Sequence, residues 1–579
     1  MAVDEMTAHP TLDGATVEVI RHHLNSTAEQ MRRTLVRTAF NPVIYEVLDF
    51  GISMYDRDRR LISESSGLLS FLGANDYAIQ KGIEKVGIHN LHSGDVVMIN
   101  YPYWSGAHVS DAMLFTPVFA EGSEVPDVYL AVRAHWMDLG AKDPGYVLDS
   151  TSMHQEGLIM PGVKVINRGK VDQQMIDILR YNSRMPDTII GDFNAQVACL
   201  RVGERRLRQI WEKFGLATVD AAVDRIIEHG ARTATDAVRA MPDGTWDAYD
   251  WLDDDGISHD LIKMAVTVTI EGEDFMVDYG DSDQAVPGPV NMPYGRTLST
   301  AKAVFKSLTT PGTPANHGHY QPLTVSCPPG NLFHAVYPAA TFTLWTGMAS
   351  FELIHKALAQ GMAQIAACSA SDEPGFMAVG THPDTGELYA VSNNEGIGWG
   401  APPSHDGANA LQHLAMTAVR NTSMEVLEHR SPIFHERLEL RQDSGGAGRW
   451  RGGLGICREV KFLAAGEMLS MKKKTKTKPW GLRGGLQPET NAMIVWPDTD
   501  RAHRARMERF TMEPGDRFRN LSGGGGGWGN PLDRPIELVR EDMLDGYVSV
   551  EQAETVYGVI VDADGTASAT GARLDHPPS

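Results

Sequence analysis

The chain has 579 residues, of which 42% are hydrophobic and 22% charged, so it can bury large cores in about two or three domains. Its 52 Lys and Arg stand against 74 Asp and Glu, which gives a formal net charge of −22. Nucleic acid and anionic membrane surfaces are therefore excluded as expected partners, because both carry the same sign of charge.

Apolar residues at helical spacing predict an amphipathic helix over 15–39. The strand patterns that follow lie at 49–55, 95–101, 113–119 and 128–135. Polar residues stand at the ends of these strands. Residues 175–239 are predicted to be helical, and 245–280 return to strands around the turn Asp253-Asp254-Asp255-Gly256.

Two further helical blocks are predicted at 346–368 and 405–421. From about residue 432 onward, short strand patterns alternate with glycine clusters. The predicted fold class is α+β and multi-domain, with mixed sheets, helical blocks and a glycine-rich, β-dominated C-terminal domain.

The cysteines and the first residues indicate a cytoplasmic protein. Cys199, Cys327, Cys368 and Cys457 are far apart and form no C-x-x-C pair, which argues against a disulfide framework. The start is acidic and lacks the apolar run of a signal peptide, and no run of about 18 apolar residues occurs. We therefore expect a soluble chain in a reducing compartment.

Two short segments have the pattern of metal ligands. His108 and Asp111 form one His-x-x-Asp step, and His135 and Asp138 form another. Imidazole nitrogens with carboxylate oxygens suit Zn²⁺, Mn²⁺ or Fe²⁺, and neighbouring strand ends can bring two such steps together. Such a short motif also recurs by chance among 21 histidines, so hydrogen-bonded core histidines are the alternative.

The glycine clusters and one basic run leave other possibilities open. Backbone N–H groups at 396–400 and 523–527 could bind an anion, but turns that need positive φ explain these glycines better. No G-x-x-x-x-G-K-[ST] motif occurs, so no nucleotide site is expected in this chain. The run 472–478 is either a solvated strand face or a contact for an anionic substrate or acidic partner.

Several segments carry a resemblance to a known family. In the first half they are 48–53 (LDFGIS), 106–111 (GAHVSD), 133–140 (RAHWMDLG), Glu156-Gly157 and 191–196 (GDFNAQ). In the second half they are Asp406-Gly407, 443–455 (DSGGAGRWRGGLG), 479–485 (PWGLRGG) and 522–529 (SGGGGGWG). In this order they resemble the hydantoinase B/5-oxoprolinase family. That family is related to N-methylhydantoinase B, the caprolactamase beta subunit and the metal-bearing subunits of acetone and acetophenone carboxylases.

The resemblance implies a divalent metal, Zn or Mn, and its ligands are Asp49, His108, Asp111 and His135. It implies catalytic roles for Asp138, which would orient His135 or bind the metal itself, and for Glu156. It also implies a hydantoinase A-type partner that binds ATP and phosphorylates the substrate. The two would form a hetero-oligomer with two copies of each subunit.

Three domains are then expected: a metal-binding α+β domain over 1–290, a middle helical and β domain over 291–431, and the glycine-rich C-terminal domain over 432–579. Two positions depart from the family. Tyr101 stands in Asn100-Tyr101-Pro102 where the family often has Asn-Asp-Pro, and Trp136 stands where it often has histidine. Both departures suggest a more apolar substrate pocket.

The expected function is that of the metal-dependent subunit of an ATP-dependent hydrolase. It would open a cyclic amide such as a hydantoin, a lactam or an oxoproline through a phosphorylated intermediate. The alternative is the metal-bearing subunit of an ATP-dependent ketone carboxylase, because nothing in the sequence separates water from carbon dioxide as the second reactant. A non-catalytic scaffold is the third hypothesis, and the retained set of metal-binding side chains argues against it.

Overall fold

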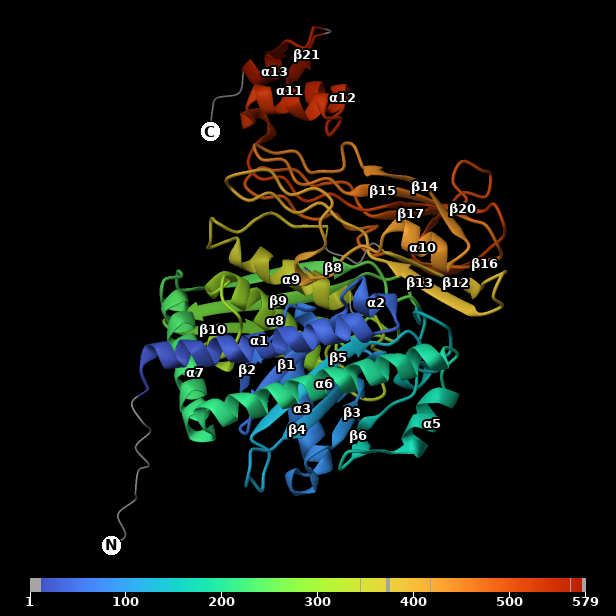
Figure 1. Cartoon of the computed structure of the whole chain (residues 1–579). Coiled ribbons are helices and arrows are strands. Elements are labelled where there is room, and N and C mark those ends of the chain that lie inside the picture. The colour runs from blue at the N-terminus through green and yellow to red at the C-terminus, as the bar shows by residue number, and fades with distance from the viewer. Residues whose placement is uncertain (1–11, 344, 371–374, 417, 563, 575–579) are drawn as a thin grey trace.

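The computed structural model describes residues 12–574, except 344, 371–374, 417 and 563. It confirms the α+β class, with several separate sheets. The glycine-rich C-terminal part lies on a body made by the preceding residues, and a small helical unit forms the far end (Figure 1). Among the described residues, none of the helices has both the length and the hydropathy needed to cross a bilayer.

A seven-stranded antiparallel sheet, in the order β2-β1-β5-β4-β3-β6-β7, forms the N-terminal part. Its strands are β1 (Phe50–Asp56), β2 (Leu61–Glu64), β3 (Val96–Ile99), β4 (Asp111–Val118), β5 (Val128–His135), β6 (Pro161–Asn167) and β7 (Lys170–Val171). The four strands predicted between residues 49 and 135 are confirmed as β1, β3, β4 and β5.

Helices cover both faces of this sheet (Figure 1). One face is covered by α1 (Gly14–Thr38) and α6 (Pro186–Phe214), which pack against each other, with α7 (Leu216–Arg239) beside them. The other face is covered by α3 (Leu69–Val86). The helices predicted over 15–39 and 175–239 are confirmed, and the second block begins with α5 (Gln173–Tyr181).

The alternation of side chains along β5 decides which residues meet which helices. Leu130 and Val132 belong to the core shared with α1 and α6, whereas Tyr129 and Ala131 belong to the core under α3. Because side chains alternate along a strand, His135 lies on the α3 face.

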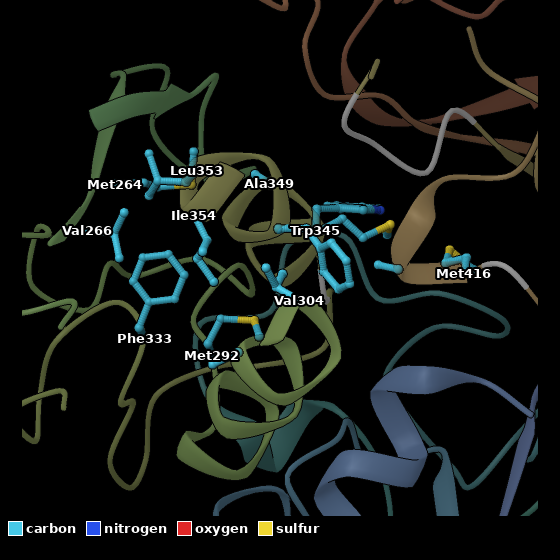
Figure 2. Packing of buried hydrophobic residues seen from close by; sticks show 14 of the residues in the cluster. Met264, Val266, Met292, Val304, Phe333, Trp345, Ala349, Leu353, Ile354 and Met416 are labelled. Carbon is cyan, nitrogen blue, oxygen red and sulfur yellow. The ribbon is translucent and has the colours of Figure 1, made fainter. Parts of the chain in front are cut away.

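A four-stranded sheet follows, in the order β11-β10-β9-β8. Its strands are β8 (Gly244–Leu252), β9 (Ile262–Glu271), β10 (Asp274–Asp278) and β11 (Leu323–Ser326). Two helices, α8 (Tyr294–Thr309) and α9 (Trp345–Leu358), pack against this sheet and each other. Figure 2 shows the buried side chains that join them, among them Met264 of β9, Val304 of α8 and Ile354 of α9.

The helix predicted over 405–421 is wrong: within its described residues only a 3₁₀ turn, Leu414–Met416, occurs. The backbone there bonds to neighbouring loops instead, since the N–H of Gly407 donates to Arg451 O at 2.7 Å and Leu411 forms a β-bridge with Ile397. Tertiary hydrogen bonds have therefore overridden local helical spacing.

Two sheets build the C-terminal part, in the orders β13-β12-β16-β19 and β14-β15-β20-β17-β18. Their strands are β12 (Phe376–Thr381), β13 (Leu388–Asn393), β14 (Ile433–Leu440), β15 (Ile456–Phe462), β16 (Gly466–Met471), β17 (Ala492–Val495), β18 (His503–Ala505), β19 (Met507–Met512) and β20 (Arg517–Leu521). The smaller elements are α2 (Pro42–Tyr45), α4 (Pro102–Ser105), α10 (Met424–Arg430), α11 (Ile536–Leu544), α12 (Val550–Thr555), β21 (Val559–Val561), β22 (Ala567–Ala569) and α13 (Gly571–Leu574).

The division into three domains stays a prediction. The sheet of β8 to β11 contains strands from both sides of residue 290. Likewise, β12 and β13 pair into a sheet with β16 and β19 across residue 431.

The glycine clusters of the C-terminal part pack backbone against backbone. A Cβ placed on Gly525 would lie 2.0 Å from Trp399 O, and one on Gly452 would lie 1.8 Å from Gly525 O. Neither glycine has a positive φ. The explanation by left-handed turns is therefore wrong at these positions. Glycine is required there because any side chain would clash with a neighbouring backbone, and not because the backbone adopts a left-handed conformation.

The first part of the basic run after β16 lies inside the molecule, whereas Lys476 and Lys478 are exposed. Lys473 and Lys474 are 1% and 2% exposed, with Lys473 Nζ 2.8 Å from Asp254 Oδ1 and Lys474 Nζ 2.7 Å from Asp250 Oδ2. Both expectations for this run, a solvated face and an intermolecular contact, are wrong for these two lysines. They join the C-terminal part to β8 and to the acidic turn after it, since burying a charge requires a partner.

Candidate metal centre

Three neighbouring strands bring three of the predicted ligands into one row. Asp111, at the start of β4, pairs directly with His135, at the end of β5. The N–H of His135 donates to Asp49 O at 3.2 Å, and Asp49 directly precedes β1. Residues directly opposite one another in antiparallel strands share a face, so Asp111 lies with His135 on the α3 face of the sheet.

His108 comes from the tight turn between α4 and β4. Gly106 ends α4 with φ 69°, and a Cβ there would lie 2.9 Å from the backbone of Gly295, so only glycine fits. The N–H of Asp111 donates to His108 O at 3.0 Å. Asn100 Nδ2 also donates to Val109 O at 2.8 Å. The turn therefore sets His108 beside Asp111.

His108, Asp111 and His135 can each offer one ligand atom, and these atoms lie within 4.8 Å of one another. His108 Nδ1 is 3.4 Å from Asp111 Oδ2, and His135 Nδ1 is 3.1 Å from Asp111 Oδ1. Ligand atoms that share one four- or six-coordinate ion are about 3.0–3.5 Å apart. His108 Nδ1 and Asp111 Oδ2 are buried without a hydrogen bond, so these side chains fit a divalent ion. Asp49 is not among the three and stays a predicted ligand.

The protonation states of this group suit metal binding. Burial lowers the pKa of His108 to about 3, so its imidazole is neutral near pH 7. Burial alone would raise the pKa of Asp111, but the adjacent His108 and His135 outweigh it and keep the pKa below its ordinary value. Neutral imidazole and ionised carboxylate are the forms that bind metal.

Helix α6 holds the strand ends from the opposite face of the sheet. Asp192 Oδ1 accepts the N–H of Asn41 at 3.1 Å, and Asn41 Nδ2 donates to His135 O at 3.0 Å. One helical turn later, Gln196 Nε2 donates to Ala112 O at 3.1 Å and to Val132 O at 2.9 Å. The sequence motif at 191–196 therefore supports the ligand-bearing strands. Its signal was two polar residues four apart on an otherwise apolar helix face.

Trp136 does not line the site. Its indole Nε1 donates to Gln196 Oε1 at 2.8 Å, and its side chain is fully buried in the core of α1 and α6. The inference of a more apolar pocket from Trp136 is therefore wrong, because strand alternation turns this side chain away from His135. Tyr101, the other departure, contacts the rings of Tyr103 and Trp104 edge-on around α4.

The two residues expected to be catalytic lie around the group. Asp138 Oδ2 accepts from Arg184 Nε at 3.1 Å. Glu156 is fully buried, and its Oε1 accepts the N–H groups of Thr341 at 2.8 Å and Phe342 at 3.1 Å. Asp138 therefore binds Arg184, and Glu156 binds the backbone of the segment that carries Phe342.

Two aromatic residues that the sequence did not single out enclose the histidines. The Phe342 ring stacks on His108 with centroids 5.0 Å apart, and the Tyr146 ring stacks on His135 at 6.1 Å. Tyr146 and Phe342 also meet edge to face at 5.3 Å. With His108 only 2% and His135 only 5% exposed, the group is closed off from solvent.

The buried carboxyl of Glu156 predicts a pH effect on stability. Burial raises its pKa to about 7 from the ordinary 4.5, so the folded chain keeps a proton that the unfolded chain has released. The free energy of unfolding therefore falls as the pH rises from about 4.5 to about 7.

Glu156→Gln keeps a carbonyl oxygen for both N–H donors and removes the titration. We expect the variant to gain on the order of 2–3 kcal/mol relative to wild type between about pH 5 and 8. Denaturant titrations at several pH values measure this, and parallel stability curves for the two proteins would contradict it.

Comparisons with known proteins find similar proteins over nearly the whole chain. The sequence model of one protein family, described as hydantoinase B/oxoprolinase, matches residues 13–531. A protein of Pseudomonas sp. (strain NS671), named as the B component of a putative D-/L-hydantoinase, is 31% identical over 580 residues, covering 95% of each chain.

Two solved structures share the fold. The ATP-dependent caprolactamase of Pseudomonas jessenii superposes with a TM-score of 0.88 at 26% identity, over 96% of this chain and 98% of that one. A nucleotide-free acetone carboxylase superposes with a TM-score of 0.88 at 19% identity, over 96% of this chain and 81% of that one. At that identity the second likeness shows the fold alone.

Proposed function

The chain belongs to the hydantoinase B/oxoprolinase family, and we propose that it is the metal-binding subunit of an ATP-dependent enzyme that hydrolyses a cyclic amide. The observation that carries this proposal is the buried group of His108, Asp111 and His135, whose ligand atoms converge within 4.8 Å. The whole-length likeness to the caprolactamase and to the B component of the hydantoinase supports cyclic amides as the substrate class.

We propose that these three residues, with Asp49 as the fourth ligand, hold Zn²⁺ or Mn²⁺, because two nitrogens and two oxygens suit either ion. When bound, such an ion supplies a water of lowered pKa and polarises the amide carbon. Neutral His108 and ionised Asp111 need no proton transfer before they bind it.

The chain's other residues orient this centre and exclude water from it. We assign Asp138 and Glu156 as positioning residues: Asp138 fixes the loop of Arg184, and Glu156 fixes Phe342 against His108. The buried enclosure keeps bulk water away from an activated substrate, which would otherwise hydrolyse before reaching the metal.

The ATP-dependent step belongs, in this proposal, to a hydantoinase A-type partner that phosphorylates the substrate. The sequence has no P-loop, and the similar proteins are named as one component of a hydantoinase and as the beta chain of a caprolactamase, which implies a second polypeptide in each enzyme. A cytoplasmic hetero-oligomer with two copies of each polypeptide would join the two sites and shield the intermediate.

The competing function is ketone carboxylation, because this chain shares its fold with an acetone carboxylase. Substrate-dependent ATP hydrolysis by the co-expressed pair separates the two. We expect turnover with hydantoins or lactams that is independent of bicarbonate and absent when either polypeptide is omitted. Strict dependence on bicarbonate together with a ketone would replace the hydrolase by the carboxylase.

A further inference from the structure

We infer that Tyr146 is the substrate-facing residue of the metal centre and that Arg509, far along the chain, is the residue that positions it. This inference rests on the proposed function, because it treats His108 and His135 as the groups that the substrate must reach.

The four rings of the enclosure differ in exposure, and this difference identifies the outer wall. His108, His135 and Phe342 are 2%, 5% and 0% exposed, whereas Tyr146 is only partly buried. Tyr146 contacts each of the other three rings, at centroid distances of 5.9 Å to His108, 6.1 Å to His135 and 5.3 Å to Phe342. Of these four side chains, Tyr146 is therefore the one that separates solvent from the histidines.

Phe342 is the fixed wall, because its own N–H and that of Thr341 are both held by the buried Glu156. Tyr146 is held in another way. Arg509 of β19 donates through Nη2 to Pro144 O and to Tyr146 O, each at 3.2 Å. The same guanidinium pairs through Nη1 with Glu467 of β16 at 2.5 Å.

The loop also lies close against the C-terminal part. Gly145 has φ 76°, and a Cβ there would lie 2.2 Å from Met377 Sδ of β12. The pose of Tyr146 is therefore set by a sheet whose strands come more than 200 residues later in the sequence.

This arrangement favours a substrate with a planar amide group. A ligand that reaches His135 must take the place of the Tyr146 ring, which now stacks on His135 and meets Phe342 at a steep angle. Stacking favours planar groups, and a cyclic amide is planar around its scissile bond.

Modification of the histidines by diethyl pyrocarbonate, resolved by peptide mass spectrometry on the full metal-free chain, tests the inference. In wild type we expect slow modification of His108 and His135. Tyr146→Ala should raise both rates about tenfold, as expected when a local barrier is removed. Tyr146→Phe keeps the ring and should keep the slow rates. Arg509→Met should raise the rates, and Arg509→Lys should restore part of the protection.

Two controls belong to the same experiment. Arg517→Met breaks a comparable ion pair, Arg517 with Glu436 at 2.7 Å, in the other C-terminal sheet, and should leave the rates unchanged. His413, 1% exposed and paired with Glu352, should stay protected in every variant. Unchanged His108 and His135 rates in Tyr146→Ala, or a parallel rise at His413, would overturn the inference. Because the protein is metal-free in this test, a failure of the proposed metal binding shows separately, in the metal content of loaded wild type.

Discussion

Replacing His108 or His135 by alanine is expected to remove both metal and turnover while the chain stays folded. Each substitution takes one nitrogen from a group of three converging ligand residues. Loss of groups that merely orient ligands costs about 10–100-fold in metal affinity, so loss of a ligand itself should cost at least about 100-fold. The fold should survive, since a typical single substitution costs about 0.5–3 kcal/mol.

Metal content after loading with Zn²⁺ or Mn²⁺, together with circular dichroism and turnover by the co-expressed pair, measures this result. His154→Ala is the matched control, because His154 is exposed and bonds to the hydroxyl of Tyr337 at 3.1 Å, away from the ligand row. It should keep wild-type metal. Stoichiometric metal in both the His108 and His135 variants would show that the ligands are assigned wrongly.

The sequence predicted the elements whose hydrophobic pattern is strong and local. The strand predicted at 128–135 is β5, and the helix predicted over 15–39 is α1 to within one residue at each end. Helix α3 was not predicted, although its buried residues Ala78, Ile79 and Ile83 cover the metal-bearing face. The helix expected at 405–421 does not form, because its backbone groups hydrogen-bond to loops that are distant in the sequence.

The candidate centre was predictable only in part. His108, Asp111 and His135 carry their signal in residue type and spacing, and the turn and strand pairing that join them are local. Tyr146 and Phe342 carry no such signal, because their place over the histidines depends on contacts between segments about 200 residues apart. The same holds for Arg509, which contacts the Tyr146 loop through two backbone carbonyls that any sequence would provide.

The second large effect is expected at Gly525, where alanine should prevent the C-terminal part from packing. The new Cβ would lie 2.0 Å from Trp399 O, a backbone atom that cannot rotate away as a side chain can. Relief requires separating segments whose backbones are joined on both sides of this residue. Gly525 N–H donates to Gly453 O at 3.0 Å, and Gly446 N–H donates to Gly525 O at 2.8 Å.

Overpacking costs about 1–3 kcal/mol or more, and each lost buried hydrogen bond adds about 1 kcal/mol, so Gly525→Ala should destabilise the chain by about 4 kcal/mol or more. Gly571→Ala is the matched control, because nothing lies within 4 Å of a Cβ there and its φ is not positive. Its effect should stay within about 0.5 kcal/mol. Thermal and denaturant unfolding of both variants measures the difference. A Gly525→Ala chain as stable as wild type would contradict this prediction. It would mean that the glycine segments pack less tightly than these distances indicate and that the clusters serve another purpose.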